Sequence, residues 1–138
     1  MVHGTCVAVG EVGVLIQGPS GAGKSGLALQ MIALGATLVA DDQVYLDRVG
    51  DTVHARAPKA LQGLIEARGI GLLSLPHQAH VALHHCIDLS QDPGGRLPKT
   101  RVVEHFGLSF PLIAGLNVPN LAASMMILGK GARLDGER

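Results

Sequence analysis

Short runs of apolar, often β-branched residues at the start of the chain predict paired strands. Thr5–Val9 and Val12–Ile16 are two such runs, and the Gly10-Glu11 dipeptide between them is typical of a hairpin turn. After a glycine-rich stretch, apolar residues recur on good helix formers from Leu27 to Leu34, and Gly35 follows where a helix C-cap belongs. The pattern therefore predicts a β-hairpin, a glycine loop and a helix, in that order.

The rest of the chain is predicted to be rich in strands. The apolar strand Ala36–Ala40 ends at two aspartates, and a second hairpin is expected around Val49-Gly50-Asp51. Pro58–Leu64 is predicted to be a short helix, since proline is tolerated in a first helical turn. Further strands are expected after Gly71 and at His80–Leu89, Arg101–Phe106 and Ser109–Ile113, with a last helix at Leu121–Leu128. This order predicts an α/β fold, a small mixed sheet with flanking helices.

Composition narrows the classes of protein that this chain can belong to. Its 138 residues fit one domain, residues 1–138, and 47% of them are hydrophobic. Eleven basic and eleven acidic residues give a formal net charge of zero, and aromatic residues make up 2%, so a nucleic-acid binder is not expected. No signal-peptide pattern and no apolar stretch of about 20 residues is present, so no membrane association is expected. We expect a soluble, cytoplasmic domain.

The glycine-rich stretch carries the strongest chemical signal. Gly18–Ser25 reads GPSGAGKS and matches the phosphate-binding pattern GxxxxGK[ST] at every fixed position, between a predicted strand and a predicted helix. Glycines allow backbone N–H groups to turn toward a phosphate, and the helix N-terminus favours negative charge. Lys24 is expected to reach the β- and γ-phosphates, and the Ser25 hydroxyl to hold Mg²⁺. The predicted nucleotide-binding residues are Gly18, Pro19, Ser20, Gly21, Ala22, Gly23, Lys24 and Ser25.

Two groups of charged residues are further candidates for chemistry. Asp41 and Asp42 end an apolar strand in the manner of a Walker B element, and adjacent side chains at a strand end point to opposite sides. One carboxylate could reach a metal while the other takes a proton from a hydroxyl. The alternative is a polar strand end leading into a hairpin. Glu66 and Arg68 could bring a metal ligand and a phosphate clamp to one loop, but their spacing alone favours a solvated turn with an incidental charge pair.

These motifs together resemble the catalytic domain of the bacterial HPr serine kinase/phosphorylase family. The resemblance runs through His3-Gly4, the GPSGAGKS loop, LVADD at Leu38–Asp42 and PKALQGLIEARGIG at Pro58–Gly71, and it extends over residues 3–113. It implies a P-loop domain of the HPr kinase/phosphoenolpyruvate carboxykinase type. It also implies ATP-dependent, Mg²⁺-dependent phosphorylation of a serine on HPr, the small carrier protein of the phosphotransferase system. Many members reverse this reaction with inorganic phosphate and release pyrophosphate.

The resemblance also implies a role for each candidate residue. Asp42 would accept the serine proton, and Asp41 beside it would support the metal or the base. His3 matches an active-site histidine that could pair with the aspartates; the alternative is a residue of a disordered chain end. Arg96 matches an arginine that steadies the transferring phosphate. The implied catalytic set is His3, Lys24, Asp41, Asp42, Arg68 and Arg96, and the implied metal ligands are Ser25, Asp41 and Glu66.

The chain departs from the family pattern in two places. No segment corresponds to the N-terminal domain of full-length members, so the chain resembles the short, single-domain form of some proteobacteria. The family's basic loop of the type RPGRN is replaced by LIAGLNVPNLA at Leu112–Ala122, which contains no arginine. Phosphorylase activity, and the partner contact and hexamer packing associated with that loop, are therefore left open. A homo-oligomer is expected from the family.

Two other functions remain open on the sequence. A small-molecule kinase could use the same P-loop, and an ATP-sensing regulatory module could bind the nucleotide with little catalysis. A metal site at His77, His80, His84 and His85 is disfavoured, because adjacent strand positions face opposite ways and no Cys or Glu completes the ligand set. We interpret these histidines as solvated or core-edge side chains.

Overall fold

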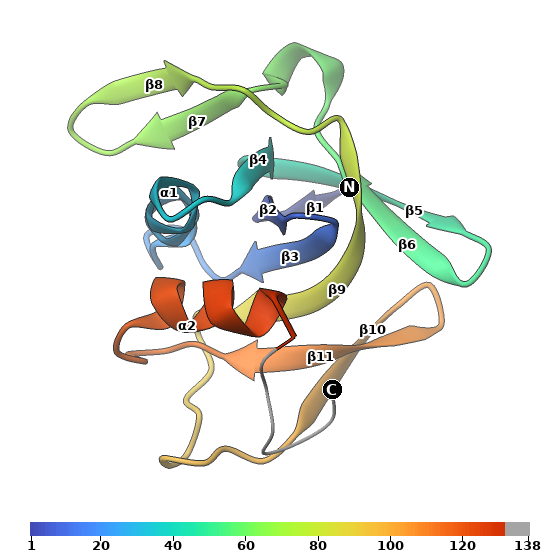
Figure 1. Cartoon of the computed structure of the whole chain (residues 1–138), viewed down its shortest axis with the longest axis vertical. Helices are drawn as coiled ribbons and strands as arrows, with labels where there is room; N and C mark the ends of the chain where they lie inside the picture. Colours follow the sequence, from blue (N-terminus) through green and yellow to red (C-terminus); the bar gives the residue numbers. More distant parts are fainter. Residues whose placement is uncertain (132–138) are drawn as a thin grey trace.

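A mixed sheet with two α-helices packed on it forms the described part of the chain, residues 1–131 of the computed structural model (Figure 1). The strands are β1 (Val2–His3), β2 (Thr5–Val9), β3 (Val12–Gln17), β4 (Thr37–Ala40), β5 (Gln43–Val49), β6 (Thr52–Arg56), β7 (Leu64–Ala67), β8 (Gly71–Ser74), β9 (His80–Asp88), β10 (Arg101–His105) and β11 (Leu108–Ala114). The helices are α1 (Lys24–Ala33), the 3₁₀ turn η1 (Lys59–Leu61) and α2 (Leu121–Gly129). The predicted α/β class is confirmed.

The long strand β9 organises the main sheet. The order is β1-β5-β6-β9-β3-β2-β4, and β11 joins β9 and carries β10 on its other side. β9 runs parallel to β3 and to β11, while its first residues pair antiparallel with β6. Figure 1 shows β9 curving between the β5–β6 hairpin and β11. β7 and β8 form a separate two-stranded sheet, which lies above α1 and β4 in the figure.

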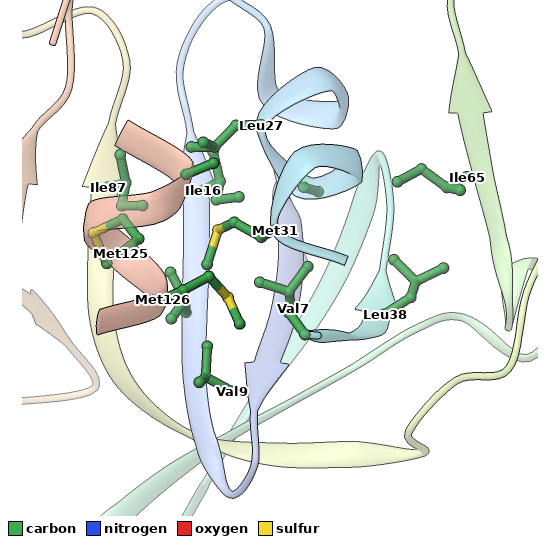
Figure 2. Packing of buried hydrophobic residues seen from close by; sticks show 14 of the residues in the cluster. Val7, Val9, Ile16, Leu27, Met31, Leu38, Ile65, Ile87, Met125 and Met126 are labelled. Atoms are coloured by element: carbon green, nitrogen blue, oxygen red, sulfur yellow. The ribbon is translucent and has the colours of Figure 1, made fainter. Parts of the chain in front are cut away.

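One hydrophobic core lies between the two helices and the sheet. Val7 and Ile16 of the β2–β3 hairpin pack with Met31 of α1 and with Met125 and Met126 of α2 (Figure 2). α1 and α2 also contact each other. This packing fixes the start of α1 against the end of β3, so the glycine loop between them is held at both ends. No helix in residues 1–131 has both the length and the apolar character needed to cross a bilayer.

The close packing of α2 on the hairpin gives a prediction about Gly129. A Cβ at Gly129 would lie 2.9 Å from the Cβ of Val9, whereas a Cβ at Gly26 in α1 would meet no atom within 4 Å. We therefore expect Gly129→Ala to lower the free energy of unfolding by about 1–3 kcal/mol through overpacking. We expect the control Gly26→Ala to raise it by about 0.5–1 kcal/mol, because alanine suits a helix better. Urea denaturation measures both, and equal effects of the two variants would contradict the packing argument.

A second core lies on the opposite face of the sheet and contains both cysteines. Cys6 of β2 and Cys86 of β9 are paired in register with Leu15 of β3, which lies between them. Both are free and buried. Burial raises the pKa of the Cys6 thiol to about 12, with a smaller contribution from Cys86, and burial raises the pKa of Cys86 to about 12 as well.

These pKa values predict that neither thiol reacts in the folded protein near neutral pH. The thiolate is the reactive form, and at a pKa near 12 its fraction at neutral pH is negligible. We expect Cys6 and Cys86 to resist a thiol reagent such as Ellman's reagent and to react with it fully in guanidinium chloride. Rapid labelling of either thiol in the native protein, located by peptide mass mapping, would contradict this burial.

The sequence predicted most of these elements. Both hairpins, α1, β4, β8, β9, β10, β11 and α2 are confirmed, most of them within one or two residues at each end. α1 begins at Lys24, three residues before the predicted Leu27, and β5 continues to Val49, which was predicted to lie in the turn. The short strand β1 was not predicted. The predicted helix at Pro58–Leu64 is wrong, because one 3₁₀ turn forms at Lys59–Leu61 and Leu64 already begins β7. The prediction of a loop at Glu66 is also wrong: Glu66 lies in β7, while Arg68 lies in the turn that follows. Alternating burial of Ile65 and Ala67 shows why a strand forms here.

Candidate active site

The glycine loop connects β3 to α1 and presents backbone rather than side chains. Gly21 and Gly23 adopt φ angles of 82° and 97°, and a Cβ at either would meet no atom within 4 Å. Gly23 is the N-cap of α1 and supplies no side-chain hydrogen bond to the first turn. The first N–H groups of the helix therefore have no capping side chain, and an anion is the partner they favour. This geometry fits a nucleotide phosphate.

Lys24 and Ser25 form the first turn of α1. The Lys24 ammonium group donates hydrogen bonds to the carbonyl oxygens of Gly18 and Pro19, at 2.9 and 3.2 Å. These contacts hold the charge of Lys24 over the loop. The Ser25 hydroxyl donates to Oδ1 of Asp41 at 2.7 Å. The helix start is thereby joined to the end of β4.

Asp41 is the meeting point of four elements. Its Oδ1 accepts hydrogen bonds from the hydroxyls of Ser25, at 2.7 Å, and Thr5, at 2.8 Å. Its Oδ2 accepts a hydrogen bond from the backbone N–H of Glu66 at 3.0 Å. Asp41 is 8% exposed. One buried carboxylate thus connects β2, the end of β4, the start of α1 and the β7–β8 hairpin.

Asp42 has the opposite environment. It adopts a φ of 71°, in the left-handed region that asparagine and aspartate tolerate better than most residues. Its side chain is 66% exposed, and Nδ1 of His3 lies 3.6 Å from its Oδ1. The backbone N–H of Gly4 donates to the Asp42 carbonyl at 3.2 Å. The two aspartates therefore differ as the strand-end pattern predicts: one is fixed and buried, and the other is accessible.

A single pocket of about 480 Å³ joins most of the predicted residues. Its lining includes Ser20, Gly21, Gly23, Lys24, Ser25, Asp41, Asp42, Glu66 and Arg68. Gly18 and Pro19 are outside the lining but hold Lys24 through their carbonyl groups. Arg68, in the turn of the β7–β8 hairpin, lines the same pocket as the glycine loop. The spacing of Glu66 and Arg68 did not by itself indicate a site. The fold of the β7–β8 hairpin brings both residues to the pocket.

Arg96 is not brought to this pocket. It lines a second cavity of about 620 Å³, together with Lys99, Arg101 and residues of β11 and the following turn. His3 is near the first pocket through Asp42 but is not part of its lining. The structure thus gathers the P-loop, Asp41, Asp42, Glu66 and Arg68, and leaves Arg96 elsewhere.

The oxygen-bearing residues of the pocket suit a hard cation. The Ser25 hydroxyl, the Asp41 carboxylate and the Glu66 carboxylate line the same space, and Mg²⁺ prefers oxygen ligands completed by water and phosphate. Across residues 1–131, no three or more His, Cys, Asp or Glu side chains are grouped to hold a metal ion by themselves. The residues therefore fit a metal that is bound together with a nucleotide.

The sequence did not indicate every residue of the site. Thr5 borders the pocket, and so do apolar side chains from α1, η1 and the β7–β8 hairpin: Leu29, Leu61, Leu64 and Leu72. The available signal for Thr5 is a hydroxyl at the start of an otherwise apolar strand. The leucines give no such signal, because their spacing resembles that of ordinary core residues. Among the four clustered histidines, His77, His80 and His84 are exposed and His85 is half-buried, as interpreted from the sequence.

Comparison with known proteins decides the family. The model of the HPr Serine kinase C-terminal domain family matches residues 1–81. The chain belongs to this family. The matched segment contains the glycine loop, both aspartates and the β7–β8 hairpin, so it includes every predicted site residue except Arg96.

Curated relatives and a solved structure extend this comparison. The chain is 47% identical over 76 residues to the HPr kinase/phosphorylase of Chromobacterium violaceum, and 43% identical over 74 residues to that of Mycoplasmopsis pulmonis. Each match covers 54% of this chain and 24% of the relative, so the chain spans about a quarter of the curated relatives it matches. The Hpr(Ser) kinase/phosphatase structure from Coxiella burnetii matches with a TM-score of 0.82 at 26% identity, covering 94% of this chain and 93% of that one. The fold likeness thus continues beyond residue 81.

Proposed function

We propose that this family member is an ATP-dependent protein serine kinase that phosphorylates an HPr-type phosphocarrier protein in the cytoplasm. The observation that carries the proposal is the difference between two adjacent aspartates beside one P-loop. Asp41 is buried and bonded to the Ser25 hydroxyl, while the Asp42 side chain is 66% exposed at the same pocket. An exposed base is accessible to a serine carried on another protein. The names of the matched relatives supply the class of that protein.

The chemistry assigns each residue a task in an in-line transfer. The serine oxygen forms a bond to the γ-phosphorus of ATP, the bond from that phosphorus to the β–γ bridging oxygen breaks, and ADP leaves. The proton of the serine hydroxyl moves to the Asp42 carboxylate. Lys24 and Arg68 carry positive charge toward the phosphoryl oxygens, where negative charge spreads in the transition state. Backbone N–H groups of the glycine loop orient the phosphates.

Ser25, Asp41 and Glu66 would hold Mg²⁺ with the nucleotide. When bound, the cation neutralises charge on the phosphate oxygens. In the reverse direction, an oxygen of inorganic phosphate would attack phosphoserine, producing pyrophosphate, while Asp42 returns the proton to the serine oxygen. The reverse activity is a separate proposal, because the segment Leu112–Ala122 lacks the basic residues of the family loop.

One assay tests the function directly. The protein is incubated with γ-labelled ATP, Mg²⁺ and HPr, and a matched reaction uses HPr in which the target serine is replaced by alanine. We expect label on wild-type HPr and none on the alanine variant. Transfer of label to small metabolites alone would support a small-molecule kinase instead. Tight nucleotide binding without any transfer would support the ATP-sensing module. Either result would overturn the proposed protein kinase.

A further inference from the structure

Thr5 is an unusual residue for its place in the fold. In the part of the chain that the structure describes, Thr5 and Asp41 are the two polar or charged side chains that are buried. Thr5 begins β2, a strand in which all five residues are buried and the other four are apolar. Its exposed fraction is 0%, and its hydroxyl donates to Oδ1 of Asp41 at 2.8 Å. The buried hydroxyl and the buried carboxylate are therefore partners.

Valine has nearly the shape of threonine and would suit this apolar strand better. A buried hydroxyl loses its hydration, which costs free energy unless a hydrogen bond replaces it. Here the hydrogen bond is made to a carboxylate, and bonds to charged groups are stronger than neutral ones. The hydroxyl of Thr5 has this one partner. Packing alone does not explain a threonine here, whereas a requirement to hold Asp41 does.

The two hydroxyls on Oδ1 of Asp41 are not equivalent. Ser25 belongs to the glycine loop and is the residue expected to ligate Mg²⁺, so its hydroxyl has a second task. Thr5 borders the pocket but its side chain is 0% exposed and belongs to the sheet, so its hydroxyl is given no second task. On the other carboxylate oxygen, the Glu66 N–H belongs to the separate β7–β8 hairpin. Among the side-chain donors to Asp41, Thr5 is the one anchored in the core.

We propose that Thr5 is a positioning residue, whose hydroxyl fixes the Asp41 carboxylate so that Asp41 and Ser25 together present oxygen atoms to the nucleotide-bound Mg²⁺. This inference rests on the proposed function for the identity of the ligand. It assigns Thr5 no contact with substrate. It makes binding of Mg²⁺·ATP depend on a side chain that lies outside every nucleotide-binding motif.

The test compares ATP affinity with and without Mg²⁺ by isothermal titration calorimetry on the intact chain. The readout is the enhancement by Mg²⁺, the ratio of the two dissociation constants. We expect Thr5→Val to lower this enhancement by about tenfold, the size expected for one hydrogen bond to a charged group. Thr5→Ser, which retains the hydroxyl, is expected to stay within about twofold of wild type. The matched control is Thr37→Val in β4, where the hydroxyl has no bond to Asp41.

A double-mutant comparison separates positioning from packing. If Thr5 acts through Asp41, Thr5→Val has no further effect on the Mg²⁺ enhancement in an Asp41→Ala background, because alanine offers the Thr5 hydroxyl no acceptor. An unchanged enhancement in Thr5→Val would overturn the proposal. An equal loss in Thr5→Ser would overturn it as well, because the methyl group would then be the cause. Should Thr5→Val fail to fold, Thr5→Ala replaces it, and its effect on the Mg²⁺ enhancement is interpreted in the same way.

The outcomes also separate this inference from the proposed function. A wild-type protein without any Mg²⁺ enhancement of ATP binding overturns both. A wild-type protein that shows the enhancement but transfers no label to HPr overturns the proposed function, and the effect of Thr5→Val on the enhancement still decides the role of Thr5.

Discussion

Asp42→Asn is expected to lower the rate of phosphoryl transfer to HPr by about 10²–10⁴-fold, the usual contribution of a general base. Asparagine has nearly the same shape and tolerates the positive φ of 71° at this position, so the backbone is expected to be undisturbed. The amide has no basic site for the serine proton. Because the Asp42 side chain is 66% exposed and outside the network around Asp41, the affinity for Mg²⁺·ATP should remain close to that of wild type. Single-turnover kinetics with labelled ATP measures the rate.

The control for this variant is Asp51→Asn. Asp51 is an exposed aspartate in the turn of the β5–β6 hairpin and does not line the pocket. It loses the same charge, so an equal fall in rate would indicate a general electrostatic effect. If Asp42→Asn bound ATP normally and transferred phosphate at the wild-type rate, Asp42 would not be the base.

Lys24→Met is expected to lower the rate of transfer by about 10²–10³-fold, as for removal of one preorganised donor at a developing charge. Methionine retains most of the length of the side chain and removes the ammonium group that now bonds to the carbonyls of Gly18 and Pro19. The affinity for ATP is expected to fall too, since the proposed contact of Lys24 with the phosphates would be made in the ground state as well as in the transition state. Titration calorimetry and the labelling assay measure the two effects separately.

Lys130→Met is the matched control for Lys24. Lys130 is an exposed lysine at the C-terminal end of α2 and does not line the pocket. It is expected to leave both affinity and rate unchanged. Wild-type affinity and rate in Lys24→Met would contradict a phosphate-binding role for the loop, and with it the proposed kinase.

The sequence was sufficient for the elements whose signals are local. The hairpin of β2 and β3, the helix that follows the glycine loop and the alternating strand β9 were predicted, because apolar periodicity and turn residues act over a few positions. The segment from Pro58 to Ala67 was not predicted correctly. Its single 3₁₀ turn and short strand β7 depend on Ile65 packing into the core that β7 shares with α1, a contact between residues distant in the chain.

The same division applies to the site. The sequence by itself determined the proposed nucleotide-binding loop, because GPSGAGKS specifies backbone geometry and charge within eight consecutive residues. The tertiary structure decided which of two adjacent aspartates is buried, since that depends on Thr5, Ser25 and the Glu66 N–H arriving from three other elements. It also placed Glu66 and Arg68 in the lining of the pocket and Arg96 in the lining of another cavity. A motif of consecutive residues can be recognised from the sequence, whereas the burial of a side chain and its hydrogen-bond partners depend on how distant segments pack.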